Sequence, residues 1–220
     1  MSLSAGRFKL RVEEGTPGAV KQTGSDGTVR YYQLFDTLTG YLDGVSVKYN
    51  DKFKVDVLNI DIRDDEDADK VYRISVNFNG SVARNLIAQL LSADVAEPVE
   101  IQTWAEELDD GKKRTKAIVR QHGKTLEWYL LSSRNEKAKS LPKERIFPAP
   151  VKTVVNGKEV WDFTGQLDML RKYVDVLDKK IKGAIVQNSA EDDEVFDADV
   201  FEETEAPAAN TASEEDDLPF

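Results

Sequence analysis

The sequence predicts a mainly β protein with one helix inserted among its strands, a second helix near the C-terminus and a disordered acidic tail. Several runs alternate apolar and polar side chains with a period of two, which is typical of strands that bury one face. Only one amphipathic helical pattern interrupts the series of strands, which disfavours all-α and doubly wound α/β folds. After Ile185 the composition becomes acidic and poor in apolar residues, so that segment cannot bury enough surface to offset its ordering entropy.

The expected strands follow one another along the first 131 residues. The clearest lies at 71–78, where four large apolar side chains share one face. Residues 14–28 are rich in Gly, Ser and Thr and indicate a loop, while Asn50 and Asp51 mark a hairpin turn. The expected strands are 8–12, Val29–Phe35, 45–49, 53–62, 71–78, 99–108, 115–121 and 126–131.

Two helices are expected from apolar stripes with helical spacing. The first covers 81–93, with Ser81 as its N-cap. The second covers 164–183 and stops at Gly183, after a Pro-punctuated, irregular connector at 142–150. We expect its stripe to pack on the strands; a dimer seam is the alternative, but the pattern is short for a coiled coil. The stripe consists of Leu167, Leu170, Val174, Leu177 and Ile181.

This element order suits an oligonucleotide-binding (OB) barrel, in which five strands surround a core and one helix seals the end. We therefore expect a mainly β, OB-fold-like domain over residues 1–183 and a tail over 184–220. A small β-sandwich would produce a similar strand pattern. The expected barrel elements are Val29–Phe35, 53–62, 71–78, the helix at 81–93, 99–108 and 115–121.

Charge is distributed unevenly along the chain. The whole sequence has a formal net charge of −11, from 41 acidic and 30 basic side chains. Residues 191–220 hold 13 of the acids and no Lys or Arg, which leaves 28 acidic and 30 basic side chains in the body. The basic region at 112–145 holds 11 Lys or Arg against 3 Glu. The overall acidity argues against binding of nucleic acid. The basic region reverses that argument, because its positive charges would attract phosphate groups.

Several classes of chemistry are disfavoured by what the sequence lacks. It has no Cys and only one His, His122, so thiolate or histidine metal sites and a Ser-His-Asp triad are not expected. No phosphate-binding glycine loop follows a strand. No apolar run approaches the roughly 20 residues that cross a bilayer. We therefore expect a soluble, cytoplasmic protein without cofactor, metal or membrane partner.

The last seven residues form the most specific motif in the chain. Four consecutive carboxylates precede an aliphatic residue, a proline and a terminal phenylalanine, whose ring and α-carboxylate suit a pocket with a basic rim on a partner protein. Here the chain resembles bacterial and bacteriophage single-stranded DNA-binding proteins, which join an OB-fold to an acidic tail ending in a D-D-x-P-F-like peptide. The resemblance is architectural over the body, whose size and short tail are closer to phage-encoded members. The matching residues are Asp216, Asp217, Leu218, Pro219 and Phe220.

The basic region also supplies most of the candidate DNA-binding residues. Arg114, Lys116 and Arg120 fall on one face of their expected strand, and two neighbouring aromatic residues fall on opposite faces of the next. Single-strand binders combine cations along the phosphates with exposed rings that stack on bases. Trp104 and Trp161 are expected in the core instead. The candidates are Tyr31, Tyr32, Arg73, Lys112, Lys113, Arg114, Lys116, Arg120, Trp128 and Tyr129.

Together these patterns predict a non-enzymatic protein that binds single-stranded DNA without sequence specificity in replication, recombination or repair. It would recruit replication or recombination proteins through its tail, as a monomer or a dimer, in a bacterial host cytoplasm if a phage encodes it. One alternative is a DNA mimic whose acids occupy a partner's DNA site. Another is a divalent-metal nuclease that uses Asp61, Asp64 and Asp67, although the acidic run 61–69 lacks the glycine and final Glu of an EF-hand loop and is also typical of a solvated turn.

Overall fold

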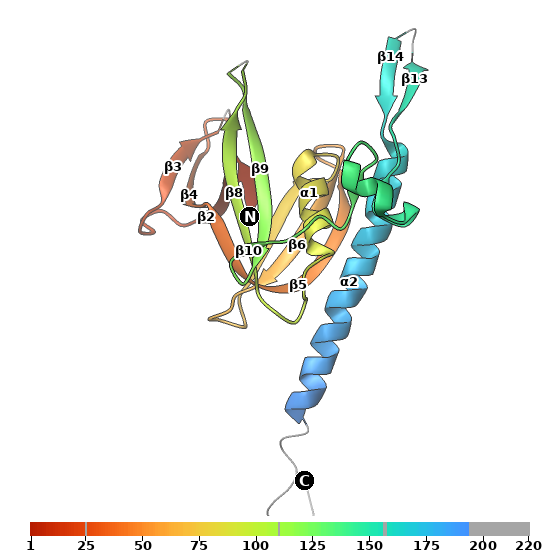
Figure 1. Cartoon of the computed structure of the whole chain (residues 1–220). Coiled ribbons are helices and arrows are strands. Elements are labelled where there is room, and N and C mark those ends of the chain that lie inside the picture. The colour runs from red at the N-terminus through yellow and green to blue at the C-terminus, as the bar shows by residue number, and fades with distance from the viewer. Residues whose placement is uncertain (25, 110, 156–157, 194–220) are drawn as a thin grey trace, which may run out of the picture.

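The computed structural model describes residues 1–24, 26–109, 111–155 and 158–193 (Figure 1). These residues form a mainly β body with two α-helices. The largest sheet joins ten strands in the order β10-β9-β8-β5-β6-β7-β1-β2-β4-β3. Its strands are β1 (Ser2–Ser4), β2 (Arg7–Val12), β3 (Val20–Thr23), β4 (Val29–Phe35), β5 (Thr37–Asn50), β6 (Val55–Arg63), β7 (Val71–Asn77), β8 (Val99–Glu107), β9 (Lys113–Gln121) and β10 (Lys124–Thr125).

After β9 the chain is less regular than the sequence predicts for its strands. The prediction of a strand at 126–131 is wrong, because only two residues, in β10, pair with β9 before the chain becomes irregular. The connector at 142–150 is more regular than expected and contains a short 3₁₀ helix and a two-residue strand. The remaining elements are α1 (Ser81–Leu90), β11 (Leu131–Ser132), η1 (Glu136–Ser140), η2 (Lys143–Arg145), β12 (Ile146–Phe147), β13 (Val151–Val155), β14 (Lys158–Asp162) and α2 (Thr164–Asp193).

Strand β5 is long, bent and shared between two antiparallel ladders. Its first residues pair with β8 and its later residues pair with β6. The register shifts between Leu42 and Gly44, and such a bulge bends a strand. Gly40 has a φ of 153°, and a Cβ there would lie 2.2 Å from the carbonyl oxygen of Arg63. Sequence analysis predicts only 45–49 of this strand, because glycines are depleted in strands and obscure its first half.

The expectation of a closed barrel is wrong, because the N-terminal strand occupies the edge that would close it. Strand β1 pairs in parallel with β7, with Ser2 opposite Ser75. The turn after β1 contacts the other end of the sheet: the Gly6 N–H donates to Thr115 Oγ1 at 3.3 Å, and its carbonyl accepts from the Thr103 hydroxyl at 2.9 Å. Strand β4, expected in the five-stranded core, instead pairs with β2 and β3.

Helix α1 covers the sheet between β7 and β9 and supplies much of the core. It begins after Gly80 rather than with Ser81 as its N-cap, and it ends three residues earlier than expected. The buried Gln89 ties the helix to the sheet, because its amide donates to the Leu126 carbonyl at 2.9 Å and its oxygen accepts from the Val119 N–H at 3.0 Å. The buried apolar residues of α1 are Ala83, Leu86, Ile87, Ala88 and Leu90.

Helix α2 packs against β5 with the stripe that the sequence predicts. At the bulge of β5, Asp178 Oδ1 accepts from the Val45 N–H at 3.3 Å. The predicted stop at Gly183 is wrong, because the helix continues to Asp193 and Ile185 still packs against the core. Glycine inside a helix costs about 1 kcal/mol relative to alanine, so Gly183 weakens the helix without ending it. No helix of the described residues is long and apolar enough to span a membrane. The buried stripe residues are Leu170, Val174, Leu177 and Ile181, with Leu167 partly buried.

Candidate nucleic-acid interface

The outward face of β9 carries the cations that the sequence places together. Ala117 and Val119 are buried at 3% and 0% exposure, because odd-numbered positions face the core. Even-numbered positions point to the other side of a pleated strand. The prediction that Arg114, Lys116 and Arg120 share one outward face is therefore confirmed, with Arg114 exposed and the other two half-buried.

Two of these three cations are paired with carboxylates on the neighbouring strand. Lys116 Nζ lies 3.2 Å from Glu106 Oε2, and Arg120 Nη1 lies 3.1 Å from Glu100 Oε1. Arg114 lies opposite Glu106 in the β8–β9 register but makes no ion pair with a described residue. The face is thus cationic with fixed side chains, but its net attraction for phosphate is lower than its count of basic residues indicates.

Trp104 and Trp161 are both exposed, so the expectation that they lie in the core is wrong for both. Trp104 is the one that lies on the sheet. It lies on β8 directly opposite Lys116, and 41% of its surface is exposed. Ile101 and Thr103, on the opposite face of β8, are buried. The same alternation in the sequence places Trp104 on the outward face, so the signal was present in the pattern. An exposed indole beside a lysine is suited to stacking on a base whose phosphate meets the cation.

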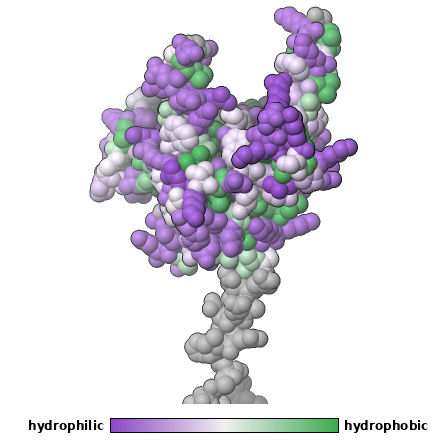
Figure 2. Space-filling view, in the orientation of Figure 1, coloured by the Kyte–Doolittle hydropathy of each residue, from purple (hydrophilic) through white to green (hydrophobic). Residues whose placement is uncertain are grey.

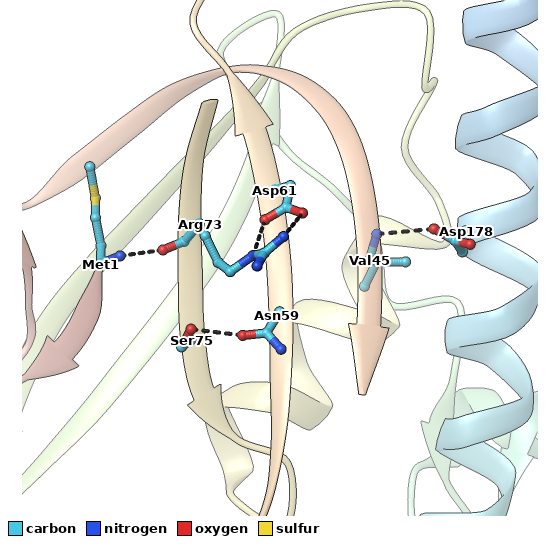
Figure 3. A network of polar contacts seen from close by, with 7 residues as sticks. All are labelled: Met1, Val45, Asn59, Asp61, Arg73, Ser75 and Asp178. Atoms are coloured by element: carbon cyan, nitrogen blue, oxygen red, sulfur yellow. Dashed lines mark hydrogen bonds and ion pairs between the residues drawn. The ribbon is translucent and has the colours of Figure 1, made fainter. Parts of the chain in front are cut away.

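Arg73 lies on the outward face of β7, where it is held by a bidentate contact with β6 (Figure 3). Its Nε and Nη2 donate to the two carboxylate oxygens of Asp61 at 2.7 and 2.8 Å. This hydrogen-bonded carboxylate raises the pKa of Arg73. Beside it, the Ser75 hydroxyl donates to Asn59 Oδ1 at 2.8 Å. The β6–β7 face is therefore polar and organised by side-chain pairs.

Tyr31 and Tyr32 lie on opposite faces of β4, away from the cations of β9 in the sheet order. Tyr32 shares its face with Lys9 and Arg11 of β2, and the Lys9 ammonium lies 5.7 Å from its ring centroid. The Tyr31 hydroxyl donates to Glu14, which raises the pKa of Tyr31. Tyr32 thus has a cation over its ring, whereas Tyr31 lies opposite Lys21 of β3 and is bonded to Glu14.

Trp128 and Tyr129 lie in the irregular segment after β10. Trp128 is 45% exposed, whereas Tyr129 packs against the core and contacts the Tyr173 ring edge-on with centroids 5.8 Å apart. The guanidinium of Arg145 covers the Tyr129 ring at 4.2 Å. One exposed and one inward residue were expected, and the structure makes Trp128 the exposed one.

The tip of the β8–β9 hairpin carries two further candidates. Lys112 precedes β9 and Lys113 is its first residue, and both are exposed. Figure 2 shows this hairpin as the projection at the upper left, facing the β13–β14 hairpin at the upper right. Lys112, Lys113 and Arg114 thus form a cationic edge that leads from the sheet face to the tip.

The carboxylates of the acidic run do not form a metal site. Among the described residues, no three His, Asp or Glu side chains are grouped so that they could hold a metal ion. Asp61 is engaged by Arg73, while Asp64 and Asp67 accept N–H groups from residues two positions later, at 3.0 and 3.3 Å. These contacts are those of an acidic turn.

The predicted docking peptide lies outside the described residues. It comprises Asp216, Asp217, Leu218, Pro219 and Phe220. Comparison of the chain with protein-family models, with curated proteins and with solved structures found no match.

Proposed function

We propose that this protein binds single-stranded DNA without sequence specificity and catalyses no reaction on it. The observation that carries the proposal is the position of Trp104 on an outward sheet face, directly opposite Lys116 and two cross-strand pairs away from Arg114 on the same face. A strand of DNA needs cations spaced along its phosphates and exposed rings for its bases, and this face offers both. Replication, recombination and repair are the processes that expose such strands.

The strand order supports an OB-like body for this function. Strand β5 pairs with both β6 and β8, α1 follows β7, and β9 returns beside β8. We propose that this order corresponds to an OB fold in which the N-terminal hairpin separates the two strands that would close the barrel. In OB folds, the face of the second and third strands and two adjoining loops bind oligonucleotides. Those features correspond here to the β6–β7 face, the β5–β6 turn and the β8–β9 hairpin.

The β5–β6 turn has the composition that this role requires. Tyr49 is 57% exposed and Phe53 is 65% exposed. The ammonium of Lys52 lies 5.6 Å from the centroid of the Phe53 ring. An open hollow beside the turn is lined by Lys48, Asn59 and residues of the turn itself. Rings and cations therefore border the β6–β7 face at this end, as they do at the β8–β9 hairpin.

We further propose that the C-terminal peptide recruits partner proteins of replication or recombination. The support is its composition: consecutive carboxylates before a terminal apolar ring suit a pocket with a basic rim. Phe220→Ala should abolish capture of such partners and leave oligonucleotide affinity unchanged, because this ring is the anchor of the peptide. A pull-down with immobilised wild-type or variant protein measures this, and equal yields would refute the docking role.

A gel shift with labelled oligothymidine, run with and without magnesium, tests the proposed activity against its alternatives. Binding is expected in both conditions, and the oligonucleotide is expected to remain intact. A DNA mimic would fail to shift the oligonucleotide. A nuclease using Asp61, Asp64 and Asp67 would cleave it when magnesium is added, but the contacts of those carboxylates do not favour that outcome.

A further inference from the structure

A second hollow lies at the base of the β13–β14 hairpin, away from the sheet face. Its lining comes from four separate parts of the chain: α1, the segment after β11, the hairpin and the start of α2. It contains two arginines, two aromatic residues and no carboxylate. The lining residues are Arg84, Ser132, Ser133, Arg134, Pro150, Trp161, Phe163 and Gln166.

The two buried polar side-chain atoms without a hydrogen-bond partner among the described residues both belong to this lining. They are Arg84 Nε, a donor, and Gln166 Oε1, an acceptor. Gln166 is only 7% exposed, and its amide nitrogen is fixed because it donates to the Pro148 carbonyl at 2.7 Å. Buried polar groups are nearly always paired, so this lining leaves one donor and one acceptor open to a bound molecule.

The arginines of the hollow differ from the cations of the sheet in their partners. Neither Arg84 nor Arg134 makes an ion pair with a described residue. The Arg84 guanidinium lies 5.7 Å from the Phe147 ring, and burial lowers the pKa of Arg84. A partly buried guanidinium with no carboxylate is an incomplete electrostatic arrangement, which an anionic group would complete.

Exposed rings stand beside these cations. Trp161 is 51% exposed and Phe163 is 41% exposed, and the ammonium of Lys152 lies 5.3 Å from the Trp161 ring. The hairpin that carries Trp161 is a two-stranded ladder that projects from the body (Figure 1). Isolated two-stranded ladders are marginally stable, so a ligand that packs on this ring would also order the hairpin.

The hollow is connected to the sheet face through the first turn of α1. A neighbouring hollow is lined by Arg114 of β9 together with Gly80, Ser81 and Val82 at the start of α1. Ser81 and Arg84 are three residues apart on a helix and therefore lie on the same side. The first turn of α1 therefore contributes to both hollows, Ser81 to the one beside β9 and Arg84 to the one beside the β13–β14 hairpin.

We propose that this hollow binds a second part of the same single strand, with a phosphate on Arg84 and Arg134 and a base stacked on Trp161. The inference rests on the proposed function and extends the binding path beyond the sheet. A strand that occupies both parts must be longer than one that covers the sheet face alone. The hollow therefore increases the affinity for long oligonucleotides and leaves that for short ones unchanged.

Oligonucleotides of two lengths test the proposal with the full chain. We would compare Arg134→Ala/Trp161→Ala with a matched control, Arg30→Ala/Val154→Ala, because all four side chains are exposed or at the surface. For oligothymidine of about 30 nucleotides the first variant should lose about 5- to 150-fold in affinity, and for about 6 nucleotides neither variant should change. The control should retain wild-type affinity at both lengths.

Each outcome separates the inference from the proposed function. If the wild type binds both lengths and Arg134→Ala/Trp161→Ala binds the long one equally well, the hollow is not a DNA site, while the sheet face retains its role. If the wild type binds neither, both proposals fail. A loss at both lengths would also overturn the inference, because it would place Trp161 in the primary site.

Fluorescence provides an independent measurement of the same contact. Trp104→Phe/Trp128→Phe leaves Trp161 as the only tryptophan, since the chain has three. Long oligothymidine should quench its emission, and salt should reverse the quenching as phosphate contacts are lost. Unchanged emission under conditions where anisotropy shows full binding would contradict base stacking on Trp161.

Discussion

The cations of the β8–β9 face and those of the β13–β14 hollow differ in their partners: two of the three on the face are paired with carboxylates, whereas neither arginine of the hollow is paired with a described residue. Lys116 and Arg120 each lie within 3.2 Å of a glutamate oxygen across the ladder. Arg84 and Arg134 make no ion pair with a described residue and line a hollow without carboxylates. On the face only Arg114 is without an ion pair to a described residue, whereas in the hollow both arginines are.

This difference shows why a count of basic residues is a poor measure of a binding surface. An exposed ion pair is worth about 0–1 kcal/mol, so a phosphate that must displace the carboxylate gains up to that much less from the cation than from an unpaired one. The pair instead holds the cation in place beside Trp104. We therefore propose that the β8–β9 face positions and stacks bases, and that Arg84 and Arg134 supply attraction for phosphate.

The largest effect is expected from the ring on the paired face. Trp104→Ala should weaken oligothymidine binding by about 1–3 kcal/mol, because stacking on an aromatic ring contributes that much per base. Trp128→Ala is the comparison, since Trp128 is a similarly exposed binding candidate that lies in the irregular segment after β10, and it should lose less affinity. Fluorescence anisotropy gives both affinities. Equal losses for the two variants would move the stacking site away from β8.

The tail is expected to compete for the cations that lack partners. Deleting residues 194–220 should raise affinity several-fold at low salt, because a tethered acidic chain acts at an effective concentration on the order of millimolar. The gain should shrink as salt screens the tail. The thermal unfolding midpoint of the truncated protein should equal that of the full chain. If affinity at low salt did not change on deletion, the tail would have no autoinhibitory role.

Releasing a paired cation should raise affinity by a smaller factor. Glu106→Gln leaves Lys116 without its partner while keeping the size of the side chain. We expect an increase of about two- to fivefold, the equivalent of the 0.5–1 kcal/mol that an exposed pair contributes. Glu136→Gln, which releases Lys139 in η1, is the control and should leave affinity unchanged. A decrease for Glu106→Gln would mean that the pair positions Lys116 more than it neutralises it.

The smallest effects should appear in the salt dependence of binding. Arg114→Ala removes a cation without an ion pair and should reduce the log–log slope by about 0.7, the value for one phosphate on a single strand. Arg120→Ala removes a cation paired with Glu100 and should reduce the slope by less. Titrations over a salt series measure both. Identical slopes for the two variants would remove the distinction between paired and unpaired cations.

Sequence periodicity predicts the parts of the fold in which one face is buried. Ile74, Val76 and Phe78 are buried as the alternation indicates, and the stripe of α2 packs as its spacing indicates. The first half of β5 is not predicted because Gly40 and Gly44 interrupt the strand pattern. The bend that these glycines permit depends on the contact of β5 with β6, which no local pattern shows. The prediction of a closed barrel is also wrong because of a long-range contact: no local pattern shows that β1 pairs with β7.

The candidate site is predictable only where it follows strand alternation. Arg114, Lys116 and Arg120 share a face as expected, and the same rule applied to β8 would have placed Trp104 beside them. The hollow at the hairpin has no such signal. Arg84, Arg134 and Trp161 are 77 residues apart at their extremes, and tertiary packing alone brings them together. Trp161, expected in the core, is exposed because its hairpin projects from the body, and the sequence pattern does not show this projection.

The most direct test of the central claim is an anisotropy titration of labelled oligothymidine with the full chain, beside a duplex of equal length, over a series of salt concentrations. Tight binding of the single strand is predicted, with a log–log slope near −0.7 for each phosphate contacted and weaker binding of the duplex, in which bases are not free to stack. No binding of the single strand at low salt, or equal affinity for both forms, would contradict single-strand binding as the function of this protein.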